Sequence, residues 1–240
     1  MSERCIITTA FGDMQENVAR LIKNIRQYVD YTIQIITSKE SKSLDGIISG
    51  YTNVEIKYVK QLWPSHHRTG QRNGDYYQMQ GCLESEYDSI LYLDADMFIV
   101  NKDFVQGFNL SHKFGILLPL NPRSFVGVDA AIGADVPIGS RAVEIPLATA
   151  YNCGTMFVDK EHCDSNSFLK WCAYIILKQP MRGPLAVWNT VNETKIVPYL
   201  LPPQWCVCAE DVGSQMPIIL HAGHEAVRNY YKYYDATTTK

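Results

Sequence analysis

The chain has 240 residues, of which 46% are hydrophobic and 20% charged, and its formal net charge is −3. This length favours one large domain, and the weak charge gives no electrostatic reason to expect a nucleic-acid partner. The seven cysteines are an odd number without paired spacing, which indicates reduced thiols and a cytoplasmic protein. We find no cleavage pattern and no window with the ~20 apolar residues of a membrane span, so any membrane contact is expected to be peripheral.

The first half of the chain alternates strand and helix patterns. Strands are predicted at 4–10, 31–37, 54–59 and 89–96, and helices at 15–29 and 74–86. The last of these strands has apolar residues on both faces, as expected of a central strand covered by helices. This order predicts an α/β domain.

The second half is less regular. We predict strands at 113–120, 154–160 and 217–222 and an amphipathic helix at 165–178. Residues 121–150 are punctuated by glycine and proline, which is typical of a functional loop, although a poorly patterned pair of strands is the alternative. The last residues, 236–240, are expected to be frayed.

Two aspartates, Asp94 and Asp96, interrupt the apolar run "SILYLDADMFIV". In a strand, residues i and i+2 point to the same side, so both carboxylates can project together while Ala95 faces away. A divalent cation removes their repulsion most directly, and Mg²⁺ and Mn²⁺ complete such oxygen-rich sites with substrate phosphates. The pattern therefore indicates a metal site for a diphosphate ligand at the end of a strand, with a solvated turn as the alternative.

The segment "ILYLDADMFIV" resembles the DxD segment of GT-A glycosyltransferases, in particular the glycogenin-like and galactinol-synthase-like (family 8-type) group. Further matches follow in the order of that family: "TTAFGD", "YNCGTMFVDK", "VPYLLPPQWCV" and "IILHAGH". The resemblance implies a single GT-A domain, a Rossmann-like mixed sheet flanked by helices. Residues 1–100 would form its nucleotide-sugar-binding half and residues 101–235 its acceptor-binding half.

The same resemblance implies a metal site. Asp94 and Asp96 would hold the cation, and His221 would be the third protein ligand, with His224 as its competitor. An imidazole beside two carboxylates favours Mn²⁺ over Mg²⁺, because nitrogen ligands suit the softer ion. Without the family pattern, a lone histidine is more often structural.

The resemblance also assigns residues to the donor, a nucleotide-diphosphate sugar that we expect to be UDP-linked. The donor-contacting set is Thr8, Thr9, Ala10 and Phe11 at the base and ribose, Arg72 and Gln78 before the DxD strand, and Ala95, Asn152, Gly154 and Arg228. Gln78 lies where the family often carries a basic residue, which leaves the neutralising role to Arg72 or another group. The segment after His221 lacks the family's lysine-proline-tryptophan, so Arg228 or Lys232 would contact the diphosphate. Ordinary turns and solvated cations are the alternatives for these residues.

The closest resemblance implies transfer with retention of configuration to an acceptor hydroxyl. Inversion would instead require a carboxylate base near that hydroxyl. The candidate bases are Asp129, Asp135, Glu144, Glu210 and Asp211, of which Asp211 and Asp129 are the first to mutate. The acceptor, a glycan, a protein or a lipid-linked intermediate, would meet residues 121–150 and Trp63, His66, His67 and Arg68, although the latter run could equally be a polar loop.

Three other classes compete with this prediction. A haloacid-dehalogenase-type phosphatase would use Asp94 as nucleophile, but such enzymes usually carry the motif near the N-terminus and Thr or Val where this chain has Phe98. A sugar-1-phosphate nucleotidyltransferase would need a Gly-rich basic loop that "TTAFGDMQENVAR" lacks. A catalytically inactive sugar-nucleotide-binding protein is the third, although Asp94, Asp96 and His221 are all present.

Overall fold

The computed structural model describes residues 3–63, 67–121, 150–179, 182–208 and 217–221. The strands are β1 (Arg4–Thr9), β2 (Thr32–Ser38), β3 (Val54–Val59), β4 (Ser89–Leu93), β5 (Met97–Ile99), β6 (Ile116–Asn121), β7 (Ala150–Tyr151), β8 (Thr155–Asp159), β9 (Tyr199–Leu201), β10 (Val207–Cys208) and β11 (Ile219–His221). The helices are α1 (Gln15–Ile25), α2 (Asp45–Ile48), α3 (His67–Glu84), α4 (Gln106–Phe114), α7 (Cys163–Lys178) and α8 (Gly183–Thr194), with short 3₁₀ turns η1 (Lys102–Val105) and η2 (Pro203–Trp205).

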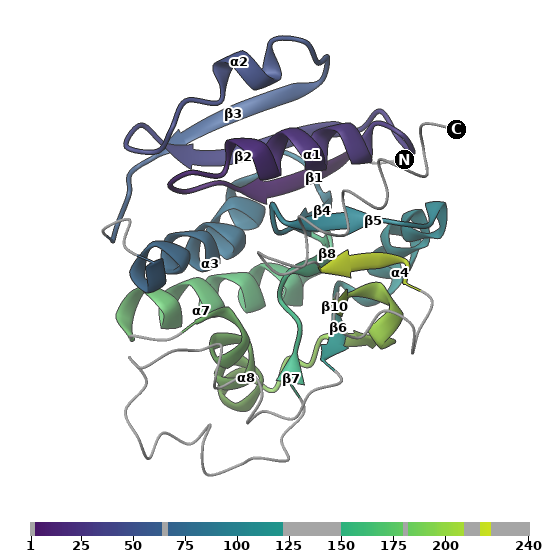
Figure 1. Ribbon diagram of the computed structural model, residues 1–240. Helices are drawn as coiled ribbons and strands as arrows, with labels where there is room; N and C mark the ends of the chain where they lie inside the picture. Colours follow the sequence, from purple (N-terminus) through teal and green to yellow (C-terminus); the bar gives the residue numbers. More distant parts are fainter. Residues whose placement is uncertain (1–2, 64–66, 122–149, 180–181, 209–216, 222–240) are drawn as a thin grey trace.

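The large sheet is mixed, as predicted. Its strand order is β3-β2-β1-β4-β8-β6-β7, with β9 beside β6. Strands β3, β2, β1 and β4 are parallel, and β8 runs antiparallel to β4 and to β6. The carboxyl end of β4 therefore lies in the middle of the sheet, where ligands of α/β proteins gather (Figure 1).

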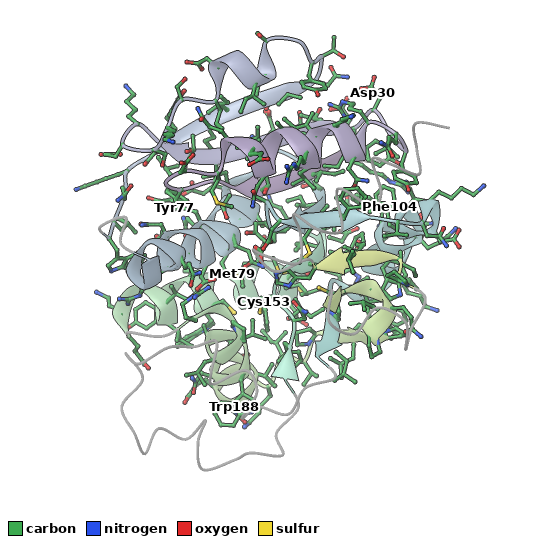
Figure 2. The ribbon with its side chains drawn as sticks, viewed as in Figure 1. Asp30, Tyr77, Met79, Phe104, Cys153 and Trp188 are labelled. Atoms are coloured by element: carbon green, nitrogen blue, oxygen red, sulfur yellow. The ribbon has the colours of Figure 1, made fainter. Side chains whose placement is uncertain are left out.

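Two hydrophobic cores cover the two faces of this sheet. Helices α3, α7 and α8 pack on one face, and α1, α4 and η1 pack on the other. Alternate residues of β4 enter different cores, because Ile90 and Tyr92 face α3 while Leu91 and Leu93 face α1 and α4. Figure 2 shows Tyr77 and Met79 of α3 above Cys153, which belongs to the same core.

Helix α1 forms as its spacing predicts. Val18, Leu21, Ile22 and Ile25 are all buried against the sheet. Asn24, on the same buried face, donates from Nδ2 to the Ile99 carbonyl at 2.9 Å and accepts from the Ile99 amide at 2.7 Å. One polar side chain of α1 thus anchors β5, the strand that follows the two aspartates.

A second, smaller sheet has the order β10-β11-β5. Strand β11 is antiparallel to β5, with His221 opposite Met97 and Ile219 opposite Ile99. The amide of Val100 also donates to the Ile218 carbonyl at 2.9 Å. These bonds bring His221 to the start of β5.

Several elements differ from the sequence predictions. Helix α3 starts at His67 rather than at Gly74, so it contains part of the run for which acceptor contact was predicted, with a polar loop as the alternative. Helix α8 was not predicted, and its early proline is compatible with a helix because the first turn needs no amide donor at that position. Within the described ranges, no helix is long and apolar enough to cross a membrane.

Candidate active site

Asp94 and Asp96 lie in a tight turn between β4 and β5. The strand prediction for these two residues is wrong: β4 ends at Leu93, and the Met97 amide donates to the Asp94 carbonyl at 3.0 Å to close the turn. The Asp94 amide donates to the Gly154 carbonyl at 2.9 Å, which fixes the start of the turn against the loop before β8. A tight turn therefore replaces the strand alternation expected to place both carboxylates on one side.

The turn and β11 bring three potential metal ligands together. Ligand atoms of Asp94, Asp96 and His221 all lie within 4.8 Å of one another. His221 Nε2 lies 3.5 Å from Asp96 Oδ1. Asp96 is buried, and Asp94 and His221 are partly exposed, so a small ion could reach the group from solvent. Two carboxylates and one imidazole suit Mn²⁺ or another divalent transition ion.

The charges of this group perturb its protonation. Burial and the neighbouring Asp96 raise the pKa of Asp94 to about 6, although His221 and the Tyr92 hydroxyl act in the opposite direction. Burial alone would lower the pKa of His221, but Asp96 and the Cys206 thiol raise it well above its ordinary value. Protonation of Asp94 and His221 thus offsets the negative charge of the two neighbouring carboxylates, and a binding cation would compete with these protons.

The segment "TTAFGD" lies beside this group at the end of β1. Thr9 Oγ1 is 2.9 Å from the hydroxyl of Tyr92, which in turn donates to Asp94 Oδ1 at 2.7 Å. Thr8 Oγ1 is buried and has no hydrogen-bond partner in the described part of the chain. The Ala10 amide donates to the Ile36 carbonyl at 2.9 Å, and the Phe11 ring stacks on Tyr77 with centroids 5.5 Å apart. Of the four predicted base and ribose residues, Thr9 is thus connected to the DxD turn, through the hydroxyl of Tyr92.

The loop Asn152-Cys153-Gly154 supports the turn from the other side. Its own Asn152 Oδ1 accepts from the Gly154 amide at 3.1 Å, and Gln78 Nε2 donates to the Cys153 carbonyl at 2.6 Å. Gln78 is buried, so in this structure its amide holds the loop, and direct contact with a donor stays a prediction. The side chain of Ala95 is buried in the core beside α1, which leaves only its backbone to meet a ligand.

Arg72 is engaged at the end of α7. Its guanidinium donates to the carbonyls of Ile176, at 2.6 Å, and Gln179, and it lies 4.3 Å from the ring centroid of Trp63. None of these contacts is with Asp94 or Asp96. Trp63 itself packs edge-on against Tyr76 of α3. These contacts tie α3 to α7 and to the chain before it, and the expected neutralising role of Arg72 stays a prediction.

A different arginine, which the sequence analysis missed, lies near the site. Arg182 donates from Nη2 to Asp75 Oδ1 at 3.3 Å, from Nε to Asp75 Oδ2 and from Nη1 to Gln71 Oε1. Burial would lower the pKa of Arg182, but Asp75 and, more weakly, Asp94 raise it. Asp75 also contributes to the raised pKa of Asp94. Arg182 and Asp75 are 107 positions apart, so no local pattern pointed to the pair.

The remaining predicted residues lie outside what the structure describes. They are His66, Asp129, Asp135, Glu144, Glu210, Asp211, His224, Arg228 and Lys232, together with residues 122–149 and the side chains of His67 and Arg68. Of the two candidates for the third ligand, His221 lies in the described residues and is close to both aspartates, and its role as a ligand stays a prediction.

No family model matches the chain, and no curated protein matches its sequence. Solved structures do match. The galactosyltransferase LgtC, in complex with donor and acceptor sugar analogues, aligns with a TM-score of 0.63 at 10% identity over 92% of this chain and 87% of its own. Mouse xyloside xylosyltransferase 1 aligns with a TM-score of 0.54 at 10% identity over 93% of this chain and 99% of its own.

A third match is a glycosyltransferase involved in glycosylation of the major capsid of PBCV-1, with a TM-score of 0.51 at 13% identity, covering 97% of this chain and 98% of its own. At such identities the comparison establishes the fold. The chain has the GT-A glycosyltransferase fold that its motifs resemble, in one domain with the DxD turn after β4.

Proposed function

We propose that this protein is a metal-dependent glycosyltransferase that moves a sugar from a nucleotide-diphosphate sugar, UDP-linked, to an acceptor hydroxyl. The observation that carries the proposal is the group Asp94, Asp96 and His221 at the carboxyl edge of a GT-A sheet. The solved structures with this fold that are described above are a galactosyltransferase, a xylosyltransferase and a capsid glycosyltransferase, which supports sugar transfer as the reaction.

The residues present fit a divalent cation. Burial and the neighbouring Asp96 raise the pKa of Asp94 to about 6, and a cation bound between the two carboxylates would offset both effects. We propose that Asp94, Asp96 and His221 hold Mn²⁺, with Mg²⁺ as the weaker fit because of the imidazole. Bound there, the ion would neutralise charge on the departing diphosphate.

The chain's own groups would bind and orient the donor. We propose that Thr8, Thr9, Ala10 and Phe11 meet the nucleoside, and the buried Thr8 hydroxyl without a partner in the described residues supports a ligand there. Asn152 and Gly154 would lie beside the sugar.

Two further side chains would meet the same sugar. Asp75, whose charge raises the pKa of Asp94, and Arg182, whose pKa is raised by Asp94, would flank the sugar from α3 and from the residue before α8. An ion pair offers both donors and acceptors, which suits hydroxyl groups.

The remaining assignments extend the proposal to the acceptor. Retention requires no base at the acceptor hydroxyl, and we propose it as the outcome; Asp211 and Asp129 are the bases to test if inversion is found. Residues 101–235 would form the acceptor half, and Arg228 would reach the diphosphate. The free cysteines Cys5, Cys82, Cys153, Cys163, Cys172 and Cys206 support a cytoplasmic location.

The test is nucleotide release from a panel of nucleotide-diphosphate sugars with Mn²⁺ and with chelator. Asp96→Asn should abolish release, whereas Asp103→Asn, an exposed aspartate in η1, should leave it unchanged. NMR of the transferred sugar then distinguishes retention from inversion. Metal-independent phosphate release from a simple phosphomonoester, without donor turnover, would contradict the proposal and favour a phosphatase.

A further inference from the structure

The hydroxyl of Tyr92 links Asp94, one of the three potential metal ligands, to Thr9 at the end of β1. Tyr92 is fully buried in β4, and its ring lies in the core beneath α3. At the tip of the ring, the hydroxyl donates to Asp94 Oδ1 at 2.7 Å and lies 2.9 Å from Thr9 Oγ1. Because β1 and β4 are parallel neighbours, with Ile7 opposite Tyr92, the ends of both strands meet at this hydroxyl.

The direction of these hydrogen bonds follows from the number of protons. Tyr92 has one hydroxyl proton, and the ionised Asp94 can only accept, so that proton belongs to the bond with Asp94. Thr9 must therefore donate its own proton to Tyr92. The order Thr9 to Tyr92 to Asp94 fixes the orientation of the carboxylate, and any ligand group that meets the Thr9 hydroxyl must itself be a donor.

We infer that Tyr92 is a positioning residue, whose hydroxyl accepts from Thr9 and holds the Asp94 carboxylate in the orientation required for the cation. The inference rests on the proposed function, because it takes Asp94 as a metal ligand. Hydrogen-bond partners of metal ligands orient them, and losing one typically weakens metal binding by about 10–100-fold. The bond from Tyr92 Oη uses one acceptor site of Asp94 Oδ1 and thereby limits the rotation of the carboxylate.

The test compares Tyr92→Phe, Thr9→Val and the double variant. Mn²⁺ affinity is measured by electron paramagnetic resonance of the free ion at about pH 8, and the melting temperature is measured with chelator. Tyr92→Phe should weaken Mn²⁺ binding by about tenfold or more. Thr9→Val should weaken it by at most about threefold, because Tyr92 still donates to Asp94.

The double variant separates orientation from packing. Tyr92→Phe alone leaves the Thr9 hydroxyl buried without its partner, and Thr9→Val removes that hydroxyl as well. The double variant should therefore regain melting temperature relative to Tyr92→Phe, while its Mn²⁺ affinity stays as weak. Recovery of Mn²⁺ affinity together with melting temperature would overturn the inference, and so would a Tyr92→Phe protein that binds Mn²⁺ within about twofold of the wild type.

Mn²⁺ binding by the wild type and by Asp96→Asn tests the premise, that the aspartates hold the ion, separately from the inference about Tyr92. If the wild type binds Mn²⁺ and Asp96→Asn does not, the metal assignment stands and the Tyr92 variants test the inference alone. If the wild type binds no Mn²⁺, the metal assignment fails, and the inference about Tyr92 is overturned with it.

Discussion

Replacing Gly154 by alanine should damage both the stability and the metal affinity of this protein. A Cβ atom at this position would lie 2.1 Å from Met97 Cε and 2.9 Å from Asp94 Oδ2. The backbone cannot easily retreat, because the Gly154 carbonyl accepts from the Asp94 amide and its amide donates to Asn152. The methionine tip is flexible, but it is fully buried, and the carboxylate is one of the three potential ligands.

The size of the effect follows from these contacts. Adding a methyl group to a filled core costs roughly 1–3 kcal/mol. For a domain of this size, that loss lowers the melting temperature by roughly 2–12 °C. Moving the Asp94 carboxylate should also weaken Mn²⁺ binding by about tenfold, the lower end of what disturbing the surroundings of a metal ligand costs.

Thermal denaturation with chelator and Mn²⁺ titration measure the two effects. Gly46→Ala is the matched control, because a Cβ at that exposed glycine meets nothing within 4 Å, and it should be neutral or slightly stabilising. Shortening Met97 to valine in the Gly154→Ala protein removes the contact with Met97 but leaves the one with Asp94, so Mn²⁺ affinity should stay low. Gly154→Ala with wild-type stability and Mn²⁺ affinity would refute the reasoning.

Three further predictions use other parts of the molecule. The pKa of Asp94, about 6, and that of His221 are both raised in the folded protein, so above about pH 4 the folded protein binds more protons than the unfolded chain. The contribution of these two groups to the free energy of unfolding therefore falls as pH rises. Because Mn²⁺ competes with these protons, the rise in melting temperature that it causes should be larger at pH 8 than at pH 5.5. Equal rises at both pH values would contradict this. Arg182→Met should destabilise by about 2 kcal/mol in urea denaturation because Asp75 loses its partner, and the double variant with Asp75→Asn should be more stable than the single one; additive losses would argue against the pair. Asn24→Leu should cost about 3 kcal/mol, because both backbone groups of Ile99 lose their buried partner, and a cost below about 1 kcal/mol would show that solvent replaces it.

Strong local patterns predicted the elements that bury a continuous apolar face. Helix α1 carries Val18, Leu21, Ile22 and Ile25 at helical spacing, and all four are buried. Strand β4 is an unbroken apolar run and lies at the centre of the sheet. In both, local propensity and tertiary burial favour the same conformation, so the sequence alone was sufficient.

The sequence was insufficient where polar residues occur inside helices. The first turns of α3 contain glycine, asparagine and glutamine, and they are held by contacts outside the helix, including the bonds of Asn73 with the backbone of Leu62 and Trp63 in the segment before it. Helix α8 begins with glycine and proline and was not predicted, but Ala186 and Val187 on its inner face are buried in the core shared with α3 and α7. Tertiary contacts outweigh weak helix propensity at both places.

In the candidate site, too, the residues in local motifs could be predicted, whereas those placed by tertiary contacts could not. The DxD residues and His221 could be predicted from motifs, and the structure brings them together. The pairing of Arg182 with Asp75 could not, because an ion pair across α3 and α8 leaves no trace in local sequence. Nor could the role of Gln78, whose amide holds the Cys153 carbonyl.

The three potential metal ligands come from two different sheets, so a bound cation would connect these sheets. Asp94 follows β4 of the large sheet, whereas His221 ends β11 of the small sheet and is placed opposite Met97 by backbone pairing. The short turn between β4 and β5 joins the two sheets covalently at the site, and Asn24 anchors the strand that follows it. A cation held by both sides would therefore join the first half of the domain to its C-terminal part. Bound Mn²⁺ should then stabilise the small sheet as well as raise the melting temperature, and hydrogen exchange of the β5 and β11 amides should become slower.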